Sequence, residues 1–452
     1  MSMRYFLIGL TVFSANILAD GWQAATRTIF TNAFSGYYGS SSVQFSDDLR
    51  GYLWLRYFNP DPEVRSYYIW ATHPSLETEF VSYSDFSTNY RVTHFEISGQ
   101  AQRLLYCTED ALPYTCKLYV EGLLGLEQFQ QDDGSVALFT RTPTYTGARG
   151  RLMSYDGSLV ASGTSCCGQW FYGVVEAWKK LDDNIYHKVV SQTREVPDQY
   201  DRPKIGGSLT VSDYSVATLL DATYSSDIPE SEIFIYQVDN LTADDEPLSS
   251  PSSRIRLPKA IYGVPAETGS IDLNRAGNHV AVATWPDADA NIPAPRGAVA
   301  VFSQSNGEWT QKGQLIDPQQ ALTGFDLEHY VFLASLGESG NSIAVSSKVN
   351  CFDDNEDLIS PCFVTIVTLW DYDAGLDRWI HRSGEGLPIS IPFSDEMNDP
   401  SPADLRYLDG AGKVGLSIYD QAKDYLMITE LERDQTSGGL PIWLLYEASQ
   451  QE

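Results

Sequence analysis

The sequence predicts an all-β protein, specifically a β-propeller of seven four-stranded blades. Two observations favour this fold: a repeat with a period near sixty residues, and an aromatic content of 12 % that is typical of strand-rich chains. Each repeat contains an apolar strand, a small or polar turn, a second apolar strand, a variable loop and an aromatic-rich strand. A unit of this length holds four short strands, and one such sheet cannot bury both faces alone. Neighbouring sheets must therefore stack, whereas tandem sandwich domains need a longer period of about 100 residues.

The elements of each unit follow in order along the chain. The turns between the first two strands fall near residues 48, 99, 157, 213, 277, 340 and 411, so the blades are predicted to start near 42, 92, 150, 207, 268, 330 and 403. We expect the first strands at 43–46, 95–98, 152–154, 209–212, 271–273, 331–334 and 405–408. The second strands are expected at 51–55, 103–106, 159–161, 216–219, 280–282, 343–345 and 414–416. Either residues 26–34 or residues 440–446 would supply the strand that completes the last blade and closes the ring.

The N-terminus is typical of a secretory signal. Arg4 provides the positive charge, residues 5–12 form the apolar core, and Ala19 precedes a cleavage site at Asp20. The alternative is a buried first strand. We predict a signal peptide at 1–19 and a single propeller domain at 20–452, and we expect the protein to be secreted, periplasmic or at the cell surface.

The charge balance excludes some partners. The chain has 60 acidic and 30 basic residues and a net charge of -30. A nucleic-acid binder needs a basic face, and adsorption to anionic membranes needs basic clusters, so neither is expected. After the apolar core of the signal, no stretch has the roughly 18 apolar residues of a membrane span, so membrane insertion is not expected either.

Six cysteines fit an oxidising compartment. Six cysteines allow 15 pairings, but their positions in the sequence favour three local pairs. One of these would be a disulfide between adjacent residues, and the alternative is that those two thiols are free or paired elsewhere. The expected pairs are Cys107 with Cys116, Cys166 with Cys167, and Cys351 with Cys362.

Two units resemble the FG-GAP-type repeats of integrin-like bacterial propellers. The fifth unit carries the segments GSIDL at 269–273, GNHVAV at 277–282 and GAVAVF at 297–302, followed by Trp309. The sixth is similar through SGNSIAV at 339–345 and Trp379, while the other five units resemble WD40-like repeats as closely. The resemblance implies a secreted propeller with calcium loops of the type Asp-x-Asp-x-Asp-Gly after the second strand. It implies no particular function.

The loops after the second strands are the predicted binding face. All three cysteine pairs fall in these loops, where disulfides would hold a fixed surface or would only protect long exposed loops. Clustered carboxylates there either bind Ca²⁺ or form a solvated acidic surface. The cluster in the fifth unit, at residues 287–291, matches the first three positions of the calcium loop but lacks its glycine and closing carboxylate. The candidate ligands are Asp287, Asp289 and Asn291 in the fifth unit, and Asp353, Asp354, Glu356 and Asp357 in the sixth.

Aromatic residues beside carboxylates on this face would suit a sugar, which stacks its CH groups on a ring. Trp54, Trp70, Trp178, Trp309 and Trp379 recur at equivalent places on strands, so we expect them to pack blade against blade. The ligand candidates at loop edges are Trp170, Tyr172, Tyr224, Asp227 and Glu230.

No catalytic motif stands out. The chain has no G-x-S-x-G elbow, H-E-x-x-H motif or P-loop, and its six histidines are scattered. The sequence therefore favours an exported, non-enzymatic binding protein whose acidic loop face takes a glycan or a protein partner, with Ca²⁺ as a candidate cofactor. The alternatives are a secreted glycan hydrolase with carboxylates near the central channel, and a structural subunit of a cell-surface assembly.

Overall fold

The structure is a computed structural model. It describes residues 22–30, 41–45, 52–61, 64–71, 81–83, 91–97, 103–109, 114–120, 126–127, 138–139, 151–164, 172–181, 186–195, 204–221, 230–257, 270–284, 297–321, 327–349, 363–381, 389–392, 400–409, 413–420 and 425–433.

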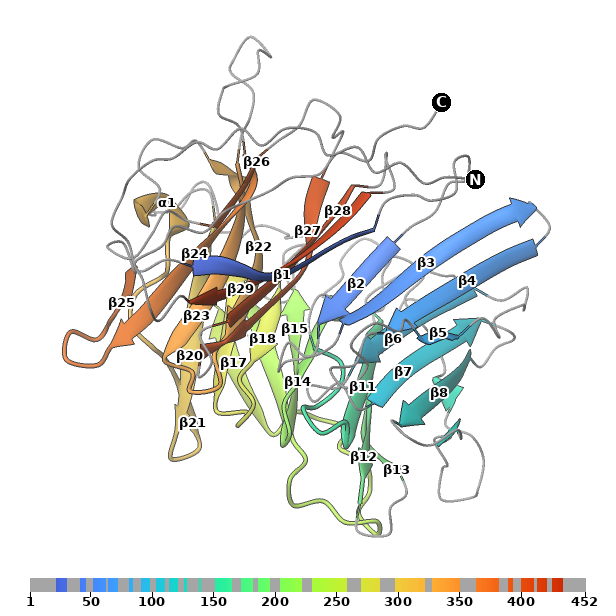
Figure 1. Ribbon diagram of the computed structural model, residues 1–452. Helices are drawn as coiled ribbons and strands as arrows, with labels where there is room; N and C mark the ends of the chain where they lie inside the picture. Colours follow the sequence, from blue (N-terminus) through green and yellow to red (C-terminus); the bar gives the residue numbers. More distant parts are fainter. Residues whose placement is uncertain are drawn as a thin grey trace, which may run out of the picture.

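Seven antiparallel sheets occur in the described residues, and their order along the chain follows the seven predicted units (Figure 1). All seven expected hairpins are present. In the third unit the first strand is reduced to a single bridge between Met153 and Val160 ahead of β11.

The first three sheets comprise the strands β2 to β13. Two of them have short outer strands, which are β5 in the first sheet and β9 and β10 in the second. Each of these strands pairs with only a short part of its neighbour. Their strands are β2 (Ser41–Phe45), β3 (Tyr52–Asp61), β4 (Val64–Ala71) and β5 (Val81–Tyr83); β6 (Arg91–Ile97), β7 (Arg103–Glu109), β8 (Tyr114–Val120), β9 (Leu126–Glu127) and β10 (Leu138–Phe139); and β11 (Leu159–Thr164), β12 (Tyr172–Lys180) and β13 (Tyr186–Glu195).

The next three sheets follow the same plan, with one short helix, α1 (Pro318–Ala321), between the fifth and sixth sheets. Their strands are β14 (Lys204–Val211), β15 (Ser215–Asp221), β16 (Ser231–Gln237) and β17 (Ser253–Leu257); β18 (Ile271–Leu273), β19 (His279–Thr284), β20 (Ala298–Ser305) and β21 (Glu308–Gln311); and β22 (Leu327–Leu336), β23 (Ser342–Val349), β24 (Phe363–Asp373), β25 (Arg378–His381) and β26 (Ile389–Pro392).

The last sheet joins the two ends of the described chain. It consists of β27 (Pro400–Leu408), β28 (Lys413–Asp420), β29 (Tyr425–Arg433) and, on its outer side, β1 (Trp22–Phe30). The register pairs Trp22 with Arg433 and Phe30 with Leu426. The dark blue β1 therefore lies beside the red strands in Figure 1. Of the two predicted closing strands, the N-terminal one is confirmed, although it begins earlier than expected, at Trp22.

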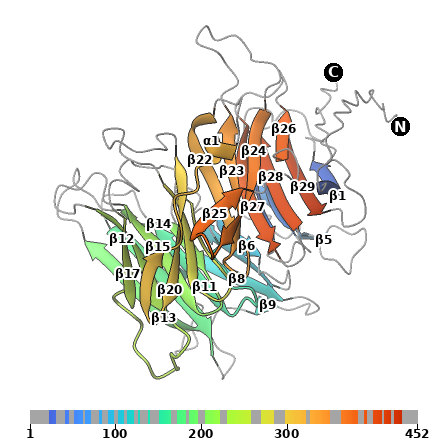
Figure 2. The same ribbon diagram turned by 90° about the vertical axis from the view of Figure 1, so that its left-hand side faces the viewer.

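Apolar side chains from neighbouring sheets meet in a separate core at each of three junctions. One core joins the third and fourth sheets, a second joins the fourth and fifth, and a third joins the fifth and sixth. Figure 2 shows the backbones of these neighbouring sheets side by side. In the fourth sheet, Val216 and Leu220 belong to the first core, whereas Ala217 and Leu219 belong to the second. Successive residues of a strand point to opposite faces, so one apolar run fills two interfaces. This packing explains why the predicted strands are continuous apolar runs rather than alternating ones.

The innermost strands pack in succession around a common axis. Contacts run from β11 to β14, β18, β22, β27, β2 and β6 in turn. Radial packing of these antiparallel sheets, each of three to five strands, around one axis confirms the all-β propeller fold. The number of blades in the ring stays a prediction.

On the innermost strands of the fifth, sixth and seventh sheets, polar side chains of the preceding sheet accept hydrogen bonds from backbone N–H groups along the inner edge. Thr210 Oγ1 accepts from Leu273 N at 3.2 Å, and Ser270 Oγ accepts from Ala334 N at 3.1 Å. Ser335 Oγ accepts in the same way from the backbone N–H of Tyr407 in the last sheet, at 3.1 Å. These buried donors would otherwise lack a partner, so the side chains both satisfy the edge and fix the register between sheets.

The substitution Thr210→Val tests whether these side-chain acceptors stabilise the fold. Valine keeps the shape of the buried Thr210 side chain but leaves the Leu273 N–H without its acceptor. We expect a loss of about 1–3 kcal/mol in the free energy of unfolding, measured by urea denaturation. Thr310→Val, on the exposed part of β21, is the matched control and should change stability little. Equal effects of the two substitutions would contradict the role given to Thr210.

Candidate functional site

The turns that follow the innermost strands are linked to one another around the axis. Asp213 accepts from Tyr155 N at 3.0 Å and from Arg275 Nε at 2.9 Å. Arg275 Nη1 reaches Glu338 Oε1 at 3.4 Å, and Glu338 N donates to Asp409 Oδ1 at 3.1 Å. One chain of polar contacts thus joins the third to the seventh sheet at this end of the axis.

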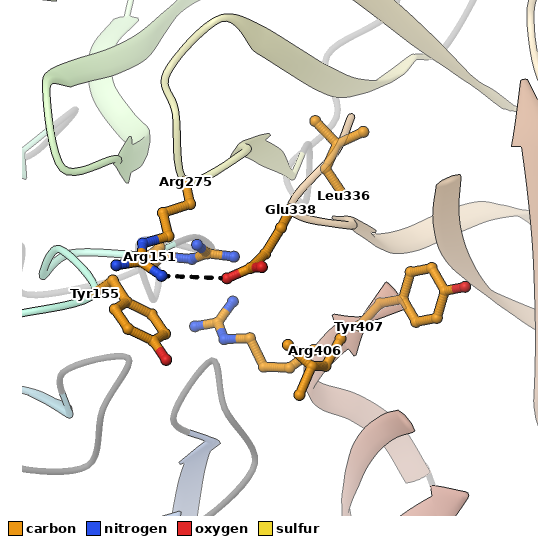
Figure 3. Close-up of a pocket in the computed structure, with 8 residues that line it drawn as sticks. Arg151, Tyr155, Arg275, Leu336, Glu338, Arg406 and Tyr407 are labelled. Carbon is orange, nitrogen blue, oxygen red and sulfur yellow. Dashed lines mark hydrogen bonds and ion pairs between the residues drawn. The ribbon is translucent and has the colours of Figure 1, made fainter. Parts of the chain in front are cut away.

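A pocket lies inside this chain of turns, at the end of the innermost strands. Figure 3 shows the guanidinium groups of Arg151, Arg275 and Arg406 arranged about the carboxylate of Glu338, with the Tyr155 ring at one side. We call this pocket the channel-end pocket. It is lined by Arg151, Tyr155, Arg275, Leu336, Glu338, Arg406, Tyr407 and Leu408.

Arg151, which lines the pocket, forms an ion pair with Asp272 of β18. Arg151 Nη2 lies 3.6 Å from Asp272 Oδ1, and both side chains are almost fully buried. Arg151 belongs to the third unit and Asp272 to the fifth, so the pair bypasses the fourth sheet. Asp272 Oδ2 also accepts from Leu336 N of the sixth sheet at 2.8 Å. A buried charge requires a partner, and here one carboxylate both balances an arginine and pairs an innermost strand edge.

Arg275 is the side chain that connects the pocket to its rim. Its guanidinium carbon lies 3.7 Å from the centroid of the Tyr155 ring, and its two ends reach Asp213 and Glu338. Burial raises the pKa of Asp213, and the hydrogen bond from Arg275 opposes that shift. A planar, permanently charged guanidinium can stack on a ring and bind two carboxylates at once, which a lysine cannot do.

A second polar cluster connects the fifth and sixth sheets. Lys312 Nζ donates to Gly340 O at 2.8 Å and to Asn341 Oδ1 at 2.7 Å, and it lies 3.0 Å from His279 Nε2. The ammonium also lies 4.6 Å from the centroid of the Tyr372 ring. Burial lowers the pKa of Lys312 to about 8. Because Lys312 follows β21 and its acceptors Gly340 and Asn341 lie in the turn before β23, the cluster links the fifth and sixth sheets.

Most of the predicted loop-face residues fall outside the described residues. This applies to Trp170, Tyr224, Asp227 and all seven candidate calcium ligands. Glu230 is half-buried and directly precedes β16, and Tyr172 is the first residue of β12. The second strand of a hairpin runs back from its turn, so these two positions lie at the end of the sheets opposite the channel-end pocket. Among the described residues, no group of three or more His, Cys, Asp or Glu side chains could hold a metal ion.

The predicted disulfides stay predictions. The register places Cys107 of β7 directly opposite Cys116 of β8, on neighbouring antiparallel strands. Both residues therefore lie on strands rather than in the loop after the second strand, where they were expected. Cys166, Cys167, Cys351 and Cys362 lie outside the described residues.

The aromatic residues expected to pack between sheets do so where their side chains are described. Trp178 and Trp379 are buried, and Trp309 packs against the core between the fourth and fifth sheets. Trp54 pairs in register with Trp70 on neighbouring strands β3 and β4.

The channel-end pocket was not predicted from the sequence. A usable signal is present, because Arg151, Asp272 and Arg406 are buried charges on segments that are otherwise apolar. In a propeller, a charge on an innermost strand points to the axis or to a neighbouring sheet. The convergence of Arg275 and Glu338 on the same point depends on contacts between units and is not visible in the sequence of either.

Comparisons with known proteins do not identify a family. No family model matches the chain, and no curated protein matches its sequence. In the described part of the chain, no helix has the length and apolar character needed to cross a membrane.

Three solved structures illustrate what the chain is similar to. A prolyl endopeptidase, described in an analysis of two such enzymes, matches with a TM-score of 0.46 and 13 % identity over 87 % of this chain and 47 % of its own. The chain thus spans about half the length of that enzyme. A putative 6-phosphogluconolactonase from Bacteroides fragilis matches with a TM-score of 0.40 and 10 % identity over 89 % of this chain and 98 % of its own. The Dos1 propeller matches with a TM-score of 0.42 and 12 % identity over 90 % of this chain and 95 % of its own. The propeller assignment rests on the strand topology described above.

The Lys312 cluster generates a prediction for the pH dependence of stability. His279 Nδ1 lies 2.8 Å from Asn278 Oδ1, and its Nε2 faces the Lys312 ammonium, so the ring is neutral when folded. Burial, followed by the charge of Lys312, lowers the pKa of His279 to about 4 from its ordinary value of 6.5. Between these two values the unfolded chain binds a proton that the folded chain does not. Stability contributed by His279 is therefore present above about pH 6.5 and is lost as the pH falls toward 4.

The substitution His279→Gln isolates this contribution. Glutamine keeps a hydrogen-bond acceptor but does not titrate, so the variant should lose less stability than the wild type between pH 7 and pH 5. The measurement is urea denaturation of both proteins at the two pH values. The many carboxylates titrate in both proteins, so their contribution cancels when the two losses of stability are compared. Parallel losses in the two proteins would refute the assignment.

Proposed function

We propose that this protein is a non-catalytic binding propeller that holds an acidic group of its partner in the channel-end pocket. The observation that carries the proposal is the convergence of Arg151, Arg275 and Arg406 on one opening of a chain whose net charge is -30. Three of only 30 basic residues gather at one point of the fold. Arginine is the side chain best suited to bind carboxylates and phosphates, because its fork of donors matches their oxygen pairs.

The chemistry of the pocket supports binding rather than catalysis. Guanidinium groups stay protonated at all physiological pH values and do not exchange protons with a substrate. The Glu338 carboxylate lies 3.4 Å from Arg275 Nη1, so the acidic group of the pocket faces a permanent positive charge. A β-propeller fold itself suggests a binding or interaction role, with the site formed where the sheets meet.

Further parts of the proposal come from the sequence alone. We propose export through the segment 1–19, and a second surface on the loops after the second strands, where a glycan or protein partner would bind with Ca²⁺ as the candidate cofactor. The two surfaces lie at opposite ends of the sheets, so variants at each can be tested independently.

The test is binding of a labelled acidic peptide, such as hexaglutamate, by fluorescence anisotropy, with a hexaglutamine peptide as the neutral probe. We expect the acidic peptide to bind and Arg275→Gln to weaken it at least tenfold, since a charge-assisted hydrogen bond contributes about 1.5–3 kcal/mol. Arg378→Gln, at an exposed position of β25, removes the same charge elsewhere and should have little effect. Thermal unfolding of each variant controls for the contact between Arg275 and Asp213.

Equal binding of the two peptides, or equal effects of the two arginine substitutions, would contradict the proposal. Binding of neutral glycans that Trp170→Ala abolishes would instead place the function on the loop face.

A further inference from the structure

Glu338 occupies the position in the channel-end pocket that a bound anion would take. Figure 3 shows its carboxylate on the side toward which the guanidinium groups of Arg151, Arg275 and Arg406 point. The pocket therefore already holds one carboxylate, supplied by its own chain. That carboxylate shows which chemical group the arginines accommodate.

The side chain of Glu338 is held weakly, although its backbone is held firmly. Its N–H donates to Asp409 Oδ1 at 3.1 Å, and its carbonyl accepts from Asn274 Nδ2 at 3.1 Å. Its carboxylate, by contrast, lies 3.4 Å from Arg275 Nη1, and the side chain is 47 % exposed. An ion pair this exposed contributes little, about 1 kcal/mol or less. The carboxylate can therefore turn toward solvent without disturbing the turn that carries it.

Two other described carboxylates near the pocket, Asp272 and Asp213, do not share this freedom. Asp272 is buried on Arg151 and also accepts from Leu336 N. Asp213 accepts from both Arg275 Nε and Tyr155 N at the junction between turns. When Glu338 turns away, these two stay in place and the pocket gains one unit of positive charge.

We propose that Glu338 is a built-in competitor, and that the partner's carboxylate binds by taking its place beside Arg275. This inference rests on the proposed function and specifies its ligand as a carboxylate rather than a phosphate. Leu336 and Leu408 line the same pocket, so a carboxylate on a short apolar stem, such as an acidic side chain of a peptide, fits the lining better than a bare inorganic anion. Exchange of one carboxylate for another keeps the charge of the pocket constant.

The test compares Glu338→Gln with the wild-type protein and with Glu308→Gln. Glutamine keeps the shape of Glu338 and removes its charge, so it should compete less, and binding of labelled hexaglutamate should become roughly fivefold tighter. Glu308, exposed on β21, is the matched control for the change in net charge, and Glu308→Gln should leave the affinity near the wild-type value. Competition by free glutarate and by inorganic phosphate against the labelled peptide distinguishes the possible sources of the anion.

Each outcome has a distinct meaning. Tighter binding to Glu338→Gln alone, with competition by glutarate and not by phosphate, supports the inference. Unchanged or weaker binding to Glu338→Gln overturns it, while the proposed function survives if Arg275→Gln still weakens binding. Equal tightening by both glutamine variants means that net charge alone acts and also overturns it. Competition by phosphate but not glutarate overturns the carboxylate assignment. The absence of hexaglutamate binding to the wild-type protein and to Glu338→Gln overturns both proposals.

Discussion

The structure depends on how the innermost strand of each sheet pairs the backbone groups along its free edge. An unpaired N–H in a buried place costs free energy comparable to a lost hydrogen bond. Here the acceptors are side chains of the preceding sheet, at Thr210, Ser270 and Ser335, and each meets a donor about one repeat later in the sequence. The loops between sheets can vary in length, but each innermost strand must pack in the same register against the innermost strand of the preceding sheet.

The same constraint accounts for the charges at the axis. At Asp272 the acceptor that pairs a strand edge is a carboxylate, where neighbouring positions use a hydroxyl. A buried carboxylate needs a positive partner, and Arg151 of the third unit supplies it. The pocket thus follows from the packing of the strands. The buried carboxylate of Asp272 requires Arg151 as its partner, and the adjoining turns place Arg275 and Glu338 at the opening.

The sequence predicted the fold well because its signals are local. Each hairpin is marked by two short apolar runs and a turn. The run at 216–220 has apolar residues at both odd and even positions because both faces of its sheet are covered. The third unit departs from the plan at Met153, where one bridge replaces a strand. The pocket could not be predicted in the same way. Arg151 and Asp272 are separated by a whole sheet in the sequence, and only the curvature of the ring brings them together. The loop-face residues other than Glu230 and Tyr172 remain predictions for the same reason, because their grouping depends on contacts between units.

The pairing of β1 with β29 has a consequence for the order of events during synthesis. Six sheets are built from strands that follow one another closely, so each can form as its strands leave the ribosome. The last sheet needs the first described strand as its outer member, and that strand must wait until the rest of the chain has been made. Until β1 has paired with it, the outer edge of β29 offers free hydrogen-bonding groups to any extended segment nearby. At high concentration that segment can be the first strand of another copy, which makes exchange of β1 between molecules the characteristic misassembly of this architecture.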